Sequence, residues 1–158
     1  MTKTFSRVAL IAASAFVAAC GSDGSTSPAS STPIETRLSA TATAPTAAIA
    51  DPMVSMKVTV TSSLPETVSG GVCAETVEAR QTNGTTWTNV TSTSFACSAM
   101  AIVLAPGSSI DLTAVADQAK IRAVAGTASS VVLRARSSLA GASTNYTLQS
   151  TEVTWQLP

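Results

Sequence analysis

Histidine does not occur among the 158 residues of this chain, and charged or aromatic side chains are scarce. Without histidine, a Ser-His-Asp or Cys-His nucleophile cannot be assembled, and the commonest zinc ligand is missing. The chain also has no glycine-rich phosphate loop and no closely spaced aspartates that would bind calcium. Its 9 basic and 9 acidic residues cancel, which leaves no basic footprint for nucleic acid. We therefore predict a protein that is not an enzyme and has no metal, cofactor or nucleic-acid partner.

Paired carboxylates are the one catalytic chemistry that this composition leaves open. The candidate acids are Glu75, Glu78, Asp111, Asp117 and Glu152. They fall on the expected strands or next to their ends, where acidic side chains are more often part of a solvated face. The catalytic interpretation is therefore the weaker one.

Aromatic residues make up only 4% of the chain, and charged residues 11%. The hydrophobic core must then be built mainly from Val, Ala, Ile and Leu. Such side chains bury less area per residue, and hydrophobic stabilisation follows buried apolar area at about 25 cal/mol per Å². A covalent cross-link would be a useful supplement to such a core.

The N-terminal segment has the three parts of an export signal. Lys3 and Arg7 form a basic head, residues 8–19 are apolar, and small residues at 17–19 lead to Cys20. The apolar run is too short for a transmembrane helix, which needs roughly 20 residues, so a cleaved signal is the better interpretation. A cysteine placed directly after small residues resembles the lipobox of bacterial lipoproteins.

The lipobox resemblance implies that Cys20 carries a diacylglyceryl group and becomes the first residue after cleavage. Two or more acyl chains hold a protein stably on a bilayer. Gly21 and Ser22 follow Cys20, with no aspartate, which by resemblance to enteric bacteria favours the outer membrane. We thus expect a lipid-anchored protein of the bacterial cell envelope, periplasmic or surface-exposed. An ordinary secretory signal with an incidental cysteine is the alternative.

Assigning Cys20 to the lipid leaves Cys73 and Cys97 as a pair. In an oxidising, exported compartment two such cysteines most simply form one disulfide. Closing a loop of about 25 residues would stabilise the fold by about 3.5 kcal/mol in the chain-entropy model. Free thiols are the alternative, and a redox-active pair fits less well because the spacing is unlike a C-x-x-C motif.

Composition divides the chain into a signal peptide over residues 1–19, a spacer over 20–50 and a folded domain over 51–158. The spacer is rich in Ser, Thr, Ala, Pro and Gly and has no sustained apolar period, so we expect it to be flexible. Its r.m.s. reach would be roughly 30 Å. Residues 34–38 could form a short ordered piece or an extra edge strand.

Apolar residues recur with a period of two from residue 53 onward, which indicates strands with one buried face. Asn83-Gly84 predicts a tight hairpin turn with positive φ, and Pro106-Gly107 predicts a type II turn. About seven short strands with such turns predict an all-β antiparallel sandwich. Their expected ranges are 53–61, 73–81, 85–91, 95–104, 110–116, 131–136 and 153–157.

Residues 114–124 allow a second interpretation. Ala and Gln tolerate a helix, and Asp117 could pair with Lys120 there. The β-branched residues on both sides favour a strand instead, so a helix of one or two turns is the weaker alternative.

The domain also resembles a known family. Cys73, a hairpin with Trp87, Cys97, the Pro106-Gly107 pair and the passage from Gly126 into Val-Leu-Arg134 carry the likeness. These features are similar to small immunoglobulin-like modules of bacterial lipoproteins, which in turn look like the bacterial intracellular proteinase inhibitor fold. Thr127 stands where such modules usually have a tyrosine. The resemblance implies an immunoglobulin-like sandwich, and it transfers no function because function resides in sites.

Trp87, Arg134 and Arg136 are the candidate binding residues. The two arginines share one face of an expected strand, for which a solvated face is the alternative, and Trp87 follows the expected hairpin turn. Trp155 alternates with apolar neighbours, so we expect it in the core. We predict a non-catalytic binding or structural module that contacts another envelope protein or a surface glycan. The alternative is a protease inhibitor that presents residues 62–72 as a rigid exposed loop.

Overall fold

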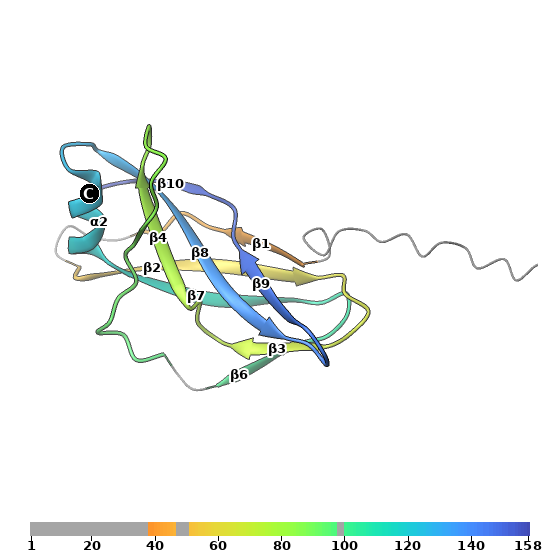
Figure 1. Cartoon of the computed structure of the whole chain (residues 1–158). Coiled ribbons are helices and arrows are strands. Elements are labelled where there is room, and N and C mark those ends of the chain that lie inside the picture. The colour runs from red at the N-terminus through yellow and green to blue at the C-terminus, as the bar shows by residue number, and fades with distance from the viewer. Residues whose placement is uncertain (1–37, 47–50, 98–99) are drawn as a thin grey trace, which may run out of the picture. The chain divides into compact units, whose positions relative to one another are not determined.

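The computed structural model describes residues 38–46, 51–97 and 100–158, and these residues form an antiparallel β-sandwich with one short helix (Figure 1). Ten strands form one sheet of three strands and one of seven. The predicted all-β fold class is therefore confirmed. No helix in the described ranges is long and apolar enough to cross a bilayer.

The smaller sheet has the order β1-β2-β7, with β2 in the centre. Its strands are β1 (Leu38–Ala42), β2 (Met53–Ser62) and β7 (Ser109–Asp117). Alternate residues of β2 are buried along its whole length, as the period of two predicts. Val58 lies opposite Leu112 in the register between β2 and β7, and both side chains enter the core.

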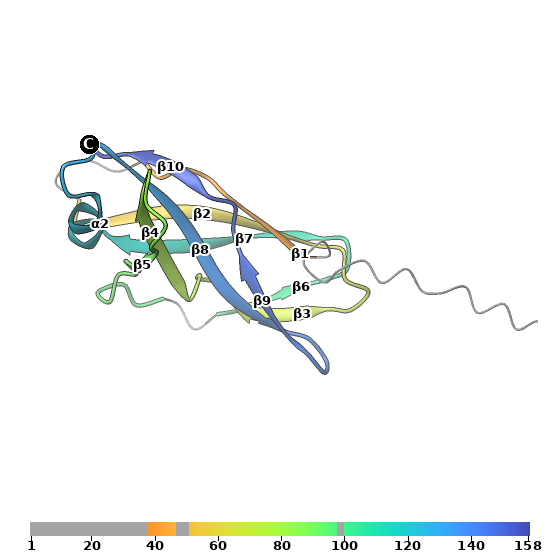
Figure 2. The same cartoon turned by 45° about the horizontal axis from the view of Figure 1, so that its top comes forward.

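The larger sheet is organised around β8, the longest strand at 11 residues (Figure 2). β8 pairs with β4 and β10 along its first half and with β9 along its second half, while β3 and then β6 follow at the far end. The strands are β3 (Val68–Gly71), β4 (Thr76–Gln81), β5 (Thr88–Asn89), β6 (Ala101–Leu104), β8 (Ser130–Ala140), β9 (Asn145–Gln149) and β10 (Val153–Gln156).

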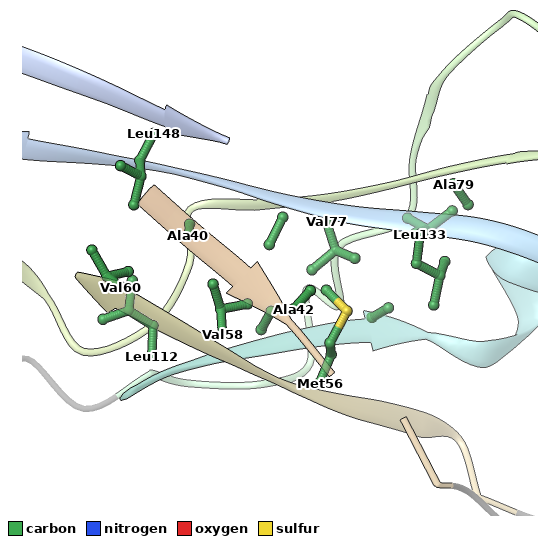
Figure 3. Packing of buried hydrophobic residues seen from close by; sticks show 14 of the residues in the cluster. Ala40, Ala42, Met56, Val58, Val60, Val77, Ala79, Leu112, Leu133 and Leu148 are labelled. Atoms are coloured by element: carbon green, nitrogen blue, oxygen red, sulfur yellow. The ribbon is translucent and has the colours of Figure 1, made fainter. Parts of the chain in front are cut away.

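The core between the sheets is mainly aliphatic, as the composition predicts. Figure 3 shows Met56, Val58 and Val60 of β2 together with Val77 of β4 and Leu133 of β8. Trp155 is buried at 5% exposure, which confirms its predicted place in the core. Alanines fill further core positions, among them Ala40 and Ala42 of β1 and Ala79 of β4.

Backbone bridges join the two sheets at both edges of the smaller one. On the β1 side, the Thr151 N–H donates to the Ala40 carbonyl at 2.8 Å. On the β7 side, the Ala74 N–H donates to the Thr113 carbonyl at 2.9 Å, and Thr91 bridges Ala116. These bonds pair groups that a free sheet edge would leave exposed.

The strand expected over residues 110–116 is present as β7, and a helix begins after Asp117, within the range 114–124 for which a helix was the weaker alternative. This helix, α2 (Gln118–Ala125), starts at a cap in which the Asp117 carboxylate accepts from the N–H groups of Ala119 and Lys120 at 2.8 and 3.2 Å. It ends at Gly126, whose φ is 62°. The helical alternative therefore holds here, because a good N-cap and a terminal glycine outweigh the strand preference of the β-branched neighbours.

The folded part begins before the predicted boundary at residue 51. Leu38, Ala40 and Ala42 are buried, and β1 pairs with β2 along five residues. This strand lies inside the segment that we expected to be flexible spacer. Its apolar positions are mostly alanine, so its burial depends on the partner strand rather than on its own hydrophobicity. The signal peptide, Cys20 and residues 34–37 lie outside the described residues.

Two turns were predicted, and one of them is confirmed. At Pro106-Gly107 the glycine has φ 73°, and the Ser108 N–H donates to the Ala105 carbonyl at 3.2 Å, as a type II turn requires. The prediction of a tight turn with positive φ at Asn83-Gly84 is wrong. β4 and β5 are joined by residues 82–87, and Gly84 does not have a left-handed φ.

The strand predicted over residues 95–104 is shorter than expected, since β6 covers only its last four residues. β3 and β9 were not predicted. β3 is short and ends in two glycines, so it carries no alternating signal. β9 does alternate, with Tyr146 and Leu148 buried between polar residues, and this signal was overlooked.

The predicted disulfide between Cys73 and Cys97 is confirmed, with a Cα–Cα distance of 6.2 Å. It joins the segment between β3 and β4 to the irregular chain before β6. The cross-link therefore supplements the aliphatic core at the β6 side of the larger sheet.

Candidate functional site

The register between β4 and β8 brings a ladder of charged side chains to the outer face of the larger sheet. Glu78 lies opposite Arg134, and Thr76 lies opposite Arg136. The alternate residues, such as Val77 and Ala135, are buried in the core. The period of two in both strands thus places the two predicted arginines together on the outside, as expected.

Trp87 reaches this ladder from the loop that connects β4 to β5. Its half-buried ring lies beneath two guanidinium groups, that of Arg134 at 3.8 Å and that of Arg80 at 5.1 Å from the ring centroid. At such distances a cation is attracted by the face of the indole. The structure therefore brings Trp87 and Arg134 into direct contact, and it adds Arg80, which the sequence reasoning missed.

Glu78 is the centre of the charge network. Its Oε2 accepts from the Arg134 Nε at 2.7 Å, and its Oε1 lies 3.7 Å from the Arg136 Nη1. The side chains of Glu78 and Arg134 are only 17% and 15% exposed, so this pair is shielded from solvent far more than an ordinary surface pair.

Arg80 is fixed by the loop that carries Trp87. Its Nη1 donates to the carbonyls of Gln81, Thr82 and Gly84 at 3.1–3.2 Å, and its Nη2 pairs with Glu152 at 2.8 Å. The guanidinium therefore holds the loop, the end of β4 and the segment before β10 together. A period-two pattern of Glu78 and Arg80 in the sequence is the signal that could have found this part of the site.

Arg136 is the least engaged cation of this face. Its side chain is 45% exposed, and its one ion pair within the described chain is the long contact to Glu78. Arg80, Arg134 and Arg136 share the face with Glu78 and Glu152, and Glu75, which accepts from Ser138 two residues along β8 from Arg136, adds a third carboxylate, so the formal charges balance.

Val132 shows that this outer face is partly closed. It lies opposite Arg80 in the register, on the outside of the sheet, yet it is only 5% exposed. Side chains of the ladder and the loop therefore cover it. The face therefore has an apolar base under its charged side chains. Trp87 packs against these side chains and stiffens the surface, and its ring is not a freely exposed binding surface.

The five candidate acids do not converge on one point. Glu78 and Glu152 belong to the arginine ladder, and Asp117 caps α2. Glu75 accepts from the Ser138 hydroxyl at 3.1 Å. No group of three or more metal-ligating side chains occurs within the described ranges.

Asp111 lies on the other sheet and has two partners there. The hydrogen bond from the Lys57 ammonium, and after it that from the Thr59 hydroxyl, lowers the pKa of the Asp111 carboxyl. The donor distances are 2.9 and 2.7 Å. The group is therefore ionised and solvated at neutral pH, as for a surface residue.

A hollow of about 600 Å³ lies where β2 and α2 begin. Pro52, Met53, Ser92 and Ser94 line it, together with the capping carboxylate of Asp117. Asp51, Gln118 and Arg122 also line it, so the hollow is a second polar site, separate from the arginine ladder.

Residues 62–72, expected as an exposed inhibitory loop, are mostly folded. Ser62 ends β2 at 0% exposure, Leu64 is buried, and β3 occupies Val68–Gly71. Glu66, in the remaining turn, is tied to the β8–β9 hairpin. The segment does not form the rigid exposed loop that the inhibitor hypothesis requires.

Comparison with known proteins gives no family for this chain. No family model and no curated protein matches it. A solved Northeast Structural Genomics Consortium target is similar over 78% of this chain and 89% of its own, with TM-score 0.50 and 8% identity. A Bordetella pertussis protein named ApaA is similar over 77% and 94%, with TM-score 0.47 and 10% identity. Likeness at such identity concerns the fold alone.

Proposed function

We propose that this chain is a cell-envelope lipoprotein, anchored through Cys20, whose sandwich is a non-catalytic binding or structural module. The basic head, the short apolar run and the cysteine after small residues support the anchor. The outer face built from Trp87, Arg134 and Arg136 supports the binding role.

The observation that carries the binding role is the state of Arg136. Its neighbours Arg80 and Arg134 are fixed by short hydrogen bonds, whereas among the described residues the ion-pair partner of Arg136 is Glu78 alone, at 3.7 Å. A guanidinium in this state can bind a carboxylate or phosphate of a partner with two parallel hydrogen bonds. The fixed ladder beside it keeps its surroundings in one geometry, which lowers the ordering cost of binding.

The partner therefore has an acidic group and approaches the outer face of β4 and β8. Another envelope protein or a surface glycan with acidic groups meets this description. The membrane is contacted through the acyl chains, not through this face.

Capture of partners from native membranes tests the binding role. The full chain and its Arg136→Gln variant are compared with Lys57→Gln, which removes an exposed cation from the other sheet. We expect the Arg136→Gln variant to recover about tenfold less partner, since a charge-assisted hydrogen bond contributes roughly 1.5–3 kcal/mol. Equal recovery by both variants, or no partner at any salt concentration, would contradict the proposal.

The protease-inhibitor alternative has less support. β2 and β3 take up five of the eleven residues of its candidate loop, and its Glu66 is engaged with another hairpin. Inhibition of any member of a panel of serine, cysteine and metalloproteases by the purified protein would restore it.

A further inference from the structure

β6 is the terminal strand of the larger sheet, with β3 as its neighbour (Figure 1). It has the sequence Ala-Ile-Val-Leu, in which Ile102 and Leu104 are buried. Val103 is 66% exposed, and Met100, just before the strand, is 67% exposed. These are the two most exposed large apolar side chains in the described chain.

The hydrogen bonding of β3 fixes which groups of β6 point outward. The Val72 N–H donates to the Met100 carbonyl at 3.3 Å. Because hydrogen-bonded pairs alternate along an antiparallel ladder, the residues that bond to β3 are Met100, Ile102 and Leu104. The N–H and C=O groups of Ala101 and Val103 therefore point away from β3. Ser69, which lies opposite Val103, pairs with Ala140 of β8 on its other side. Its backbone groups therefore point away from β6, which agrees with this alternation.

Three other edge strands of the sandwich are covered or blunted, and β9 and β10, which pair with β8, are bridged to β1 through the segment between them at Ser150 and Thr151. β1 and β7 are bridged to the larger sheet, through Ala40 on one side and Thr113 on the other. β5, at the opposite end of the larger sheet, has only two residues, and both are polar. β6 has neither charge nor proline, which are the usual devices that keep an edge strand from pairing.

We propose that β6 pairs antiparallel with β6 of a second copy of this chain, around a two-fold axis at Ile102. Ala101 of each copy then lies opposite Val103 of the other, so each outward N–H meets an outward C=O. The small Ala101 side chain leaves room for the larger Val103 side chain that faces it. The result is one continuous sheet through both copies.

Charge and symmetry single out a second copy as the occupant. β6 and the neighbouring β3 have no charged residue, so two copies meet without like-charge repulsion, and a charged peptide would find no complement. A two-fold axis satisfies both copies with one self-complementary patch. Because four-residue strands bury less than a standard interface of about 1,600 Å², we expect a weak, reversible dimer.

Disulfide trapping of the full chain in its native membrane tests the register. Ala101→Cys and Val103→Cys variants are produced together, because the opposed Cα atoms would be about 5.5 Å apart, within disulfide reach. Either variant alone places its cysteines diagonally, about 7–8 Å apart. We expect roughly tenfold more cross-linked dimer from the mixture than from either variant alone or from Thr147→Cys on β9. Equal cross-linking in all samples, or none, would overturn the proposal.

A proline at the edge separates strand pairing from other modes of association. Val103→Pro removes an outward N–H that β3 does not use, so the fold tolerates it better than a proline elsewhere in the sheet. Val103→Thr keeps the N–H and serves as the matched control. In detergent-solubilised full chain, sedimentation velocity should show a concentration-dependent dimer for the threonine variant and about tenfold weaker association for the proline variant. A dimer unaffected by the proline would contradict the pairing.

Discussion

Glu66 joins two loops that are far apart in the sequence. Its carboxylate accepts from the Tyr146 hydroxyl and, at 2.9 Å, from the Ala142 N–H in the β8–β9 hairpin. These two hydrogen bonds, the tyrosine's first, lower the pKa of the Glu66 carboxyl below its ordinary value of 4.5. A Cβ added at Gly141 would come within 2.9 Å of the Tyr146 ring and 3.0 Å of the Glu66 carboxyl group, so a larger residue there would displace the ends of both side chains.

Replacing Glu66 by glutamine should lower the melting temperature at neutral pH, because the two donors lose an anionic acceptor. The folded-state pKa is the lower one, so the ionised carboxylate stabilises the fold above the unfolded pKa of about 4.5. That contribution is lost as the pH falls through the folded value. The melting temperatures of wild type and variant should therefore converge in acid, which thermal unfolding from pH 7 to about pH 2 measures. A difference that is constant over this range would contradict the assignment.

A substitution at Leu133 tests the contribution of a single residue to the core. It is 1% exposed and lies between the sheets on β8. Leu133→Ala should lower the free energy of unfolding by about 2–5 kcal/mol, since it removes buried methyl groups and leaves a cavity between the sheets. Denaturant titration measures this, with the exposed Val103→Ala as control, which should change stability by less than about 0.5 kcal/mol.

At the scale of elements, sequence patterns predicted some strands well and missed others for identifiable reasons. β2, β8 and β10 were predicted because each has a long or clear alternation of buried and exposed positions. β1 was taken for spacer because its buried positions include two alanines, whose burial comes from pairing with β2. α2 was the weaker alternative because the strand preference of its β-branched neighbours was given more weight than its two capping residues, Asp117 at the start and Gly126 at the end.

The cap of α2 yields a prediction for this element. Asp117→Ala removes the acceptor for two N–H groups of the first turn and should cost about 1 kcal/mol of unfolding free energy. Asp117→Asn keeps an oxygen acceptor and should lose much less. Chemical denaturation of both variants measures the difference, and equal losses would show that the carboxylate acts in some way other than capping.

The candidate site was predictable only in part. Alternation in β8 placed Arg134 and Arg136 on the outside, and the structure agrees. The stacking of Trp87 on Arg134 and Arg80 was not predictable, because it depends on the conformation of a loop with no periodic signal. The order of the strands was not predictable either, because the pairing of strands distant in sequence is set by the closed core rather than by any one segment.

At the scale of the whole molecule, the Cys73–Cys97 disulfide links a loop to the larger sheet's far edge. The Cys73→Ala/Cys97→Ala double variant should lose about 2–4 kcal/mol of unfolding free energy, because the unfolded chain gains the entropy of an open loop. Denaturant titration of the variant, beside wild type with and without reductant, measures it. Unchanged stability in both comparisons would contradict a stabilising role for the bond.

At the scale of the whole molecule, the proposed function requires a fatty-acylated Cys20 at the mature N-terminus to hold the sandwich on a membrane. Mass spectrometry of the protein isolated from its native host measures this directly. The predicted result is a chain that begins at Cys20 and has the added mass of a diacylglyceryl group and further acyl chain. A chain that retains Met1, or begins elsewhere with an unmodified Cys20, would contradict the account.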